Sequence, residues 1–225
     1  MLLDAGYPGR HLANMPVTAK ICGLSTPATL DAAIGGEASH VGFVFFPPSP
    51  RHLSPEQAAG LAARVPDRVG RVGIFVDPDD DLLAAAVTLA RLDAVQLHRT
   101  DPARTATIRA RHGQTWAALP VKTRGDLDAA RSYAGAADRI VYDAKTPTGA
   151  TLPGGMGLRF DWALLDDFAH PLPWILSGGL DPGNVGEAVR RTGASLVDVS
   201  SGVESAPGVK EVDKIAAFLK AVQQP

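Results

Sequence analysis

PWILSGGLDPGNVGEAVRRTGASLVDVSSG, residues 173–202, holds a complete strand–helix–strand unit. Its two apolar, β-rich runs are Pro173–Ser177 and Ser195–Ser200, and each leads into a glycine-containing turn. Between them, Gly178–Pro182 opens a stretch of helical composition that ends at Arg191. Two consecutive strands joined by a crossover helix run parallel, because the helix returns the chain to the end of the sheet where the first strand began. This unit therefore predicts a parallel α/β fold.

The same alternation continues toward the N-terminus as far as Val17. The other apolar runs are Thr18–Cys22, His40–Phe46, Arg71–Val76, Asp93–His98, Thr115–Leu119 and Arg139–Asp143. Helices are predicted over 26–34, from 54 (a Ser54–Gln57 capping box), from 77, over 101–111 and 126–133, from 161, and over 210–222. About eight units in this length predict a single (β/α)8 TIM barrel, class α/β, over residues 17–225. An open doubly wound sheet is the alternative, but the first turn, Cys22–Thr26, lacks a G-x-G-x-x-G fingerprint.

The first residues lack this pattern. Residues 1–16 are rich in Gly and Pro and non-periodic, so we expect a flexible N-terminal extension, and Met15 is a candidate for the true start. A secretory signal would need an apolar run of about 7–15 residues. Here such a run is interrupted by Asp4, Gly6, Pro8 and Gly9. We therefore expect a cytoplasmic protein with a reduced thiol.

Composition excludes several classes of function. Lys and Arg total 22 against 24 Asp and Glu, a formal charge of -2, which argues against non-specific nucleic-acid binding. The single cysteine, Cys22, excludes an internal disulfide and a cysteine-cluster metal site, and we expect no metal. No apolar run approaches the roughly 20 residues that span a bilayer, so no membrane partner is expected. The 23 Gly and 18 Pro fit a chain with many tight connections.

In a barrel of this kind the active site lies at the carboxyl ends of the strands, and phosphate is often held after strands 7 and 8. The seventh and eighth runs end in Ser177-Gly178-Gly179 and Ser200-Ser201-Gly202. Glycine lets the backbone approach an anion, and free N–H groups at helix starts donate to it. Two ordinary turns are the alternative, but their joint position after strands 7 and 8 favours a phosphate site.

Cys22 ends the first run, at the rim where catalysis is expected. A free cysteine is most often a small buried hydrophobic residue, but at this position it could act as a nucleophile or a general base. Lys20 shares its strand face and would help to lower the thiol pKa from about 8.5. A nucleophilic cysteine needs a nearby histidine; His98 ends the fourth run, but no sequence feature pairs the two residues.

Asp143 ends the sixth run, where a helix cap or a turn residue is the ordinary alternative. The long, glycine-rich segment Ala144–Gly157 follows, and it fits a flexible cover over a substrate better than a tight turn. A carboxyl group in a partly closed barrel mouth can keep its proton and act as a general acid. Asp143 would then face Cys22 across the mouth.

Arg51 closes the stretch FPPSPR, residues 46–51, after the second run. The prolines stiffen this loop and would position the guanidinium for a bidentate contact with a carboxylate or phosphate. A solvent-exposed surface arginine is the alternative.

These residues lie in motifs that resemble phosphoribosylanthranilate isomerase. The matching motifs are KICGL (20–24), GFVFFPPSPR (42–51), DAK (143–145), GGMG (154–157), LSGGL (176–180) with Asn184, and VDVSSGVE (197–204). The resemblance implies a cofactor-free Amadori rearrangement of N-(5-phosphoribosyl)anthranilate in tryptophan biosynthesis. It implies that Asp143 protonates the ring oxygen, Cys22 removes the C2 proton, Arg51 holds the anthranilate carboxylate, and the two glycine turns hold the phosphate. His98 would line the substrate site, and the protein would be a monomer or a homodimer.

Several positions depart from the family pattern, among them Ala117, which stands where a Lys before Ala118 is common. Arg99 stands where Gly usually follows Leu-His, and Met156 replaces a polar residue in the cover loop. They motivate a second hypothesis, a catalytically weak or silent phosphate-binding barrel. A hydrolase with a cysteine nucleophile is a third.

The closed barrel carries one further hypothesis. Strand 8 would pair with strand 1, and Asp198 shares a face with Ser200 as Lys20 does with Cys22. If both faces point inward, Asp198 can pair with Lys20 near the thiol.

Overall fold

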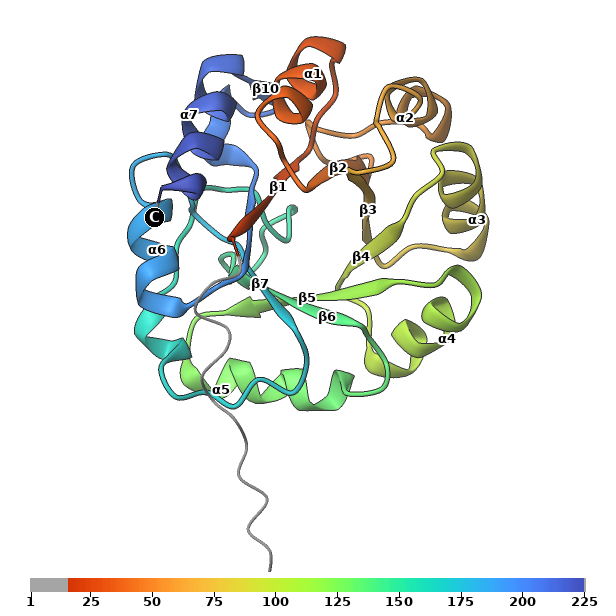
Figure 1. Ribbon diagram of the computed structural model, residues 1–225. Coiled ribbons are helices and arrows are strands. Elements are labelled where there is room, and N and C mark those ends of the chain that lie inside the picture. Colours follow the sequence, from red (N-terminus) through yellow and green to blue (C-terminus); the bar gives the residue numbers. More distant parts are fainter. Residues whose placement is uncertain (1–15, 225) are drawn as a thin grey trace, which may run out of the picture.

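The computed structural model describes residues 16–224 (Figure 1). Eight parallel strands close into a barrel in sequence order, which confirms the predicted (β/α)8 fold. The strands are β1 (Thr18–Cys22), β2 (His40–Phe45), β3 (Gly70–Val76), β4 (Ala94–His98), β5 (Thr115–Val121), β6 (Arg139–Ala144), β7 (Trp174–Leu176) and β8 (Leu196–Val199). The N-terminal extension and a start at Met15 concern residues that lie almost entirely outside the described range, so both stay predictions.

Helices form the outer ring (Figure 1). They are α1 (Pro27–Gly35), α2 (Pro55–Ala62), α3 (Asp80–Leu89), α4 (Pro102–His112), α5 (Arg124–Leu127), α6 (Val185–Thr192) and α7 (Val212–Gln223). The 3₁₀ helices are η1 (Asp128–Tyr133), η2 (Trp162–Leu165) and η3 (Ser201–Val203). The Ser54–Gln57 capping box is present, with Pro55 in the first turn of α2, as the sequence predicts.

Three predicted helices differ in form or bounds. The helix expected over 126–133 is a single α-turn followed by η1, and the helix expected from 161 is the four-residue η2. The helix after β7 begins at Val185 and not within Gly178–Pro182. Gly178 and Gly179 have φ values of 88° and 65°, in the left-handed region, so the chain cannot be helical there. Asn184 instead donates from Nδ2 to the Gly179 carbonyl at 2.9 Å and fixes the turn.

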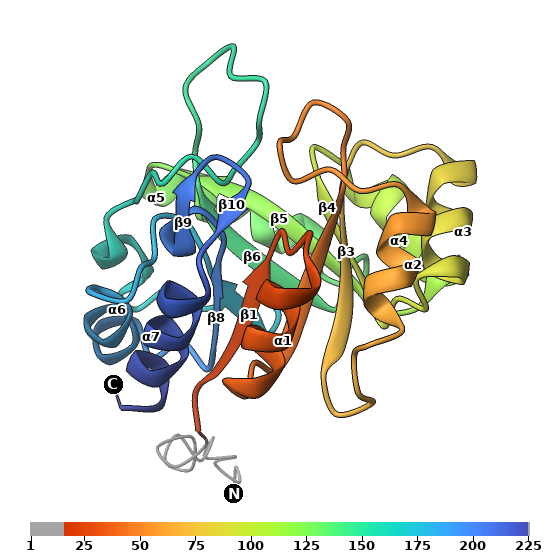
Figure 2. The same cartoon turned by 90° about the horizontal axis from the view of Figure 1, so that it is seen from above.

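The structure also contains a hairpin that the sequence analysis did not predict. Strands β9 (Glu204–Ala206) and β10 (Val209–Lys210) pair antiparallel between β8 and α7. Each strand is too short to show an alternating pattern of its own. The hairpin lies at the same end of the barrel as the loops after β2 and β6, which project furthest in Figure 2.

Two apolar layers hold the barrel together. The larger one fills the space between the strands and the helix ring and includes Ile21, Phe43, Phe75 and Phe218, all fully buried. The smaller one fills the barrel interior with residues such as Val44, Ile74, Trp116 and Ile175, and Cys22 belongs to it. No helix among residues 16–224 is long and apolar enough to cross a membrane.

Candidate active site

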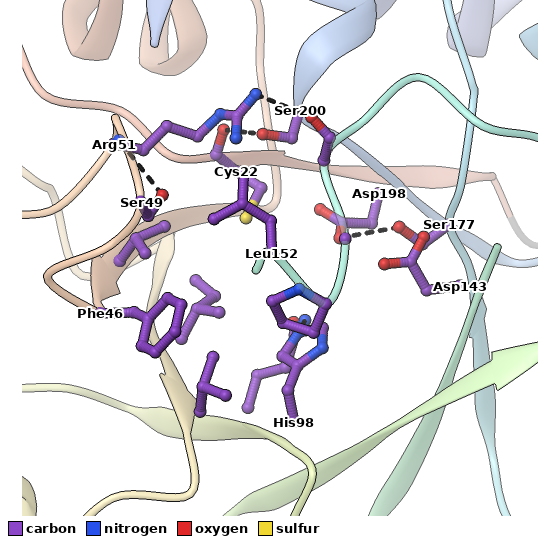
Figure 3. Close-up of a pocket in the computed structure, with 17 residues that line it drawn as sticks. Cys22, Phe46, Ser49, Arg51, His98, Asp143, Leu152, Ser177, Asp198 and Ser200 are labelled. Carbon is purple, nitrogen blue, oxygen red and sulfur yellow. Dashed lines mark hydrogen bonds between the residues drawn. The ribbon is translucent and has the colours of Figure 1, made fainter. Parts of the chain in front are cut away.

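Polar side chains from several strand ends converge on one cavity with an empty volume of about 540 Å³ (Figure 3). Its lining includes five predicted site residues: Cys22, Arg51, His98, Asp143 and Ser200. Cys22 and Ser200 are 178 positions apart, so the closed barrel brings together residues that are distant in the sequence. In Figure 3, Asp143, Ser177 and Asp198 lie on one side of the cavity and Phe46 and Ser49 on the other.

Cys22 lies at the end of β1 and is 7% exposed. Burial raises the pKa of its thiol above the ordinary value, although the charge of Lys20 acts in the opposite direction. The expected help from Lys20 is therefore present but smaller than the effect of burial. Since an ionised sulfur in this apolar layer is costly, Cys22 is a neutral thiol at pH 7 in the free protein.

Lys20 and Asp198 form a buried ion pair of 2.7 Å beneath this site. They are aligned partners in the β1–β8 pairing, which confirms the hypothesis that both face the barrel interior. Burial by itself lowers the pKa of Lys20, but Asp198 and Cys22 raise it more strongly, so the net pKa is raised. The ammonium group therefore stays charged. Asp198 also accepts a hydrogen bond from the Ser177 hydroxyl at 3.3 Å.

Asp143, near the end of β6, carries an unusually basic carboxyl group. Burial, assisted by the charge of Asp198, raises its pKa to about 7. The N–H of Ala144 donates to its Oδ1 at 2.9 Å and opposes this rise without cancelling it. A carboxyl group that is half protonated near neutrality can donate a proton, as a general acid must.

Arg51 is 5% exposed, so it is not the surface arginine that was the alternative. Its Nε and Nη2 donate to the two carboxylate oxygens of Glu204, each at 2.7 Å, and Nη2 also donates to the Gly155 carbonyl at 3.0 Å. Lys210 forms a second ion pair with Glu204. The sequence pattern predicts neither Glu204 nor Lys210 as a partner. Glu204 is quoted in the motif VDVSSGVE, but nothing in the local pattern pairs it with Arg51.

His98 lies at the end of β4 and is 8% exposed. Burial, followed by the charges of Lys20 and Arg99, lowers its pKa to about 4, so the ring is neutral at pH 7. Its Nε2 lies 3.0 Å from Nε2 of Gln96, another lining residue that the sequence analysis missed. Gln96 stands two residues before His98, on the same strand face, and that spacing was the available signal. Within residues 16–224 no hydrogen bond joins His98 to Cys22, so the pairing that a cysteine nucleophile needs is not formed.

The two glycine turns line an adjoining space of about 340 Å³, together with the cover loop. Gly178, Gly179, Ser200 and Ser201 are all part of its wall. A side chain at Gly178 would place its Cβ 2.5 Å from the backbone nitrogen of Ala144, so this position requires glycine. Gly202 lies beside this turn, in η3. The wall therefore consists largely of close backbone, which suits an anion bound by N–H groups.

The loop after β6 covers both spaces. Leu152, Pro153, Gly154 and Gly155 line the larger cavity, and Met156 is 48% exposed. Arg99, which has a φ of 55°, donates from Nη2 to the Ala150 carbonyl in this loop at 3.1 Å. Arg99 thus points to the cover loop and does not line the larger cavity. Within residues 16–224, no group of three or more His, Cys, Asp or Glu side chains is arranged to hold a metal ion.

Comparison with known proteins places this geometry in a family. Residues 19–221 match the model of the family described as N-(5'-phosphoribosyl)anthranilate (PRA) isomerase. An N-(5'-phosphoribosyl)anthranilate isomerase of Zymomonas mobilis subsp. pomaceae is 54% identical over 212 residues, covering 93% of this chain and 99% of that protein. One of Paramagnetospirillum magneticum is 52% identical, covering 93% and 98%.

Solved structures agree. Phosphoribosyl anthranilate isomerase from Thermotoga maritima matches with a TM-score of 0.83 at 34% identity, covering 93% of this chain and all of that one. A structure of phosphoribosyl anthranilate isomerase in complex with reduced 1-(o-carboxyphenylamino)-1-deoxyribulose 5-phosphate matches with a TM-score of 0.79 at 33% identity and the same coverage. The barrel, the polar strand ends and these relatives agree: the chain belongs to the phosphoribosylanthranilate isomerase family, enzymes of tryptophan biosynthesis.

Proposed function

We propose that Asp143 and Cys22 are the general acid and the general base of the isomerase reaction, the Amadori rearrangement of N-(5-phosphoribosyl)anthranilate. The observation that carries the proposal is their meeting in one buried cavity, where Asp143 has a pKa of about 7. Asp143 donates its proton to the furanose oxygen while the C1–O bond breaks, which leaves an iminium between C1 and the anthranilate nitrogen. Cys22 then takes the proton from C2, and the enolamine tautomerises to 1-(2-carboxyphenylamino)-1-deoxyribulose 5-phosphate.

The reaction requires the reverse of the protonation states that Asp143 and Cys22 have at rest. At pH 8, Asp143 is largely ionised and Cys22 is a thiol, because the thiol has the higher pKa. The acting form has the proton on Asp143 and the charge on Cys22, a minor arrangement of the same single proton. Lys20 lies on the same strand face and lowers the cost of the thiolate. We propose this as its contribution to the reaction.

We propose that the rest of the cavity and the adjoining space bind the two ends of the substrate. Arg51 is proposed to hold the anthranilate carboxylate, with neutral His98 as a wall of the same space. The turns at Gly178-Gly179 and Ser200-Ser201-Gly202 are proposed to hold the phosphate through backbone N–H groups. No residue in this assignment requires a cofactor.

Two substitutions test the acid and the base. Asp143→Asn removes the proton donor and keeps the shape, so kcat should fall by at least about 10²-fold. In Cys22→Ser, kcat should fall by a similar factor, because a hydroxyl is a much weaker base at neutral pH. Both are followed by the change in fluorescence as substrate is consumed. A parental kcat in either variant would remove that residue from the mechanism, and a covalent adduct trapped on Cys22 would contradict the role of base.

Location and assembly stay proposals: we propose a cytoplasmic enzyme that is a monomer or a homodimer. Sedimentation equilibrium on the purified protein distinguishes the two states of assembly.

A further inference from the structure

The carboxylate of Glu204, beside the cavity, accepts several hydrogen bonds. Its Oε1 accepts from Nε of Arg51 at 2.7 Å and from Lys210, and its Oε2 accepts from Nη2 of Arg51 at 2.7 Å and from the N–H of Gly208 at 3.3 Å. The side chains of Glu204 and Lys210 are 4% and 1% exposed. Arg51 and Lys210 keep the pKa of Glu204 below its ordinary value, although burial acts to raise it. Its charge is therefore present at neutral pH.

This bonding leaves one edge of the Arg51 guanidinium for a ligand. Glu204 accepts hydrogen bonds from Nε and from one N–H of Nη2. The Gly155 carbonyl accepts one from the second N–H of Nη2. Among residues 16–224, no acceptor is bonded to Nη1. A Cβ on Gly155 would lie 2.8 Å from this atom, so the cover loop reaches Nη1 only because residue 155 is glycine. The free edge of Arg51 thus lies between the cavity wall and the cover loop.

The charges leave this edge positive. Two cations, Arg51 and Lys210, share the single carboxylate of Glu204. If Glu204 paired with Arg51 alone, the pair would be neutral and would attract an anion weakly. With Lys210 included, the group of three carries one net positive charge, which matches one carboxylate.

Lys210 also ties this group to the other parts of the site. Its Nζ donates to the Ser200 carbonyl at 3.1 Å and lies 3.3 Å from the Ser200 hydroxyl. That hydroxyl in turn donates to the backbone carbonyl of Cys22 at 3.3 Å. The hairpin of β9 and β10 therefore fixes Arg51 relative to both the phosphate turn and the thiol.

We infer that Glu204 is a positioning residue for recognition of the substrate carboxylate: it clamps Arg51 from behind so that Nη1 faces the anthranilate carboxylate, and Lys210 keeps the assembly cationic. The inference rests on the proposed role of Arg51. Glu204 itself touches no substrate atom in this scheme; it fixes the rotamer of a side chain that would otherwise lose several rotatable bonds of freedom on binding.

The test compares two ligands in the parent enzyme and in Glu204→Gln. One is reduced 1-(o-carboxyphenylamino)-1-deoxyribulose 5-phosphate, and the other is the same compound with a phenyl group in place of the carboxyphenyl group. The parent should prefer the carboxylated ligand. Glu204→Gln should reduce that preference by roughly 10- to 100-fold, the range expected when a charge-assisted contact is lost. It should leave the affinity for the phenyl compound nearly unchanged, and KM should rise more than kcat falls.

Matched variants separate positioning from folding. Glu204→Asp keeps the charge and should recover part of the preference, whereas Glu187→Gln, an exposed glutamate on α6, should behave as the parent. Glu204→Gln combined with Lys210→Met keeps one net positive charge around Arg51, so this double variant should fold and still lose the preference.

Different results would contradict the role of Glu204 and the role of Arg51. An unchanged preference in Glu204→Gln and in the double variant, with a clear preference in the parent, would overturn the inference alone. An equal loss of affinity for both ligands would do the same, since it indicates a merely structural role. A parent that binds both ligands equally would overturn the carboxylate role of Arg51, and the inference with it.

Discussion

Burial at the end of β6 raises the pKa of Asp143. The same burial lowers the stability of the folded protein when this carboxyl group is ionised. The folded-state pKa of about 7 exceeds the unfolded value near 3.9, so the folded protein binds the extra proton between these values. Stability from this group is therefore fully present below about pH 4 and is lost as the pH rises through 7. Asp143→Asn should be more stable than the parent at pH 8, by up to roughly 4 kcal/mol, with no difference at pH 4.

Urea unfolding at both pH values measures this difference, with exposed Asp67→Asn as the control. A variant that is less stable than the parent at pH 8 would show that Asp143 is ionised and well bonded in the fold. The predicted gain in stability, paired with a loss of kcat, is what a group kept for catalysis should show.

The two proposed catalytic residues also determine how kcat/KM depends on pH. Because activity needs one proton shared between Asp143 and Cys22, kcat/KM should rise with pH up to about 7, stay level, and fall only above the raised pKa of the thiol. In Asp143→Asn, the rise near 7 should disappear, and the residual rate should climb until Cys22 ionises. The substrate phosphate titrates near about 6 in both proteins, so the variant is the internal control. A parent profile that falls through pH 7 would contradict the inverted protonation.

At the scale of elements, Arg99 links the end of β4 to the cover loop after β6 through the Ala150 carbonyl. Its φ of 55° is strained for a residue with a Cβ, by about 1–2 kcal/mol. Arg99→Gly removes the link and the strain together, whereas Arg99→Ala removes only the link. Unfolding in urea should therefore find the glycine variant more stable than the alanine variant by about 1 kcal/mol.

Limited proteolysis with thermolysin should cut residues 145–157 faster in both variants than in the parent, because both lose the link to Ala150. Equal cutting of all three proteins would show that Arg99 does not restrain the loop.

At the scale of the whole molecule, Lys20 and Asp198 join the first strand of the barrel to the last. Lys20→Met leaves a buried carboxylate without its partner and should cost about 3–5 kcal/mol in the free energy of unfolding. Adding Asp198→Leu removes the unpaired charge and should restore most of this loss, since apolar pairs of similar volume often replace buried ion pairs without cost. Chemical denaturation of the three proteins measures both effects. A double variant as unstable as Lys20→Met would mean that packing, and not the unpaired charge, dominates.

The sequence determined the barrel and the strand ends, because the alternation of apolar runs and helices is a local pattern that each unit carries by itself. Cys22, Asp143 and His98 could be placed near the mouth for the same reason: each ends a run. Only the tertiary structure decided what surrounds them. Arg51 and Glu204 are 153 positions apart, and the raised pKa of Cys22 depends on burial against strands far away in the chain. The short hairpin likewise has a distant partner, since Glu204 in β9 bonds to Arg51. Such pairings and burial depend on how the closed barrel brings distant segments together, and no local pattern encodes that.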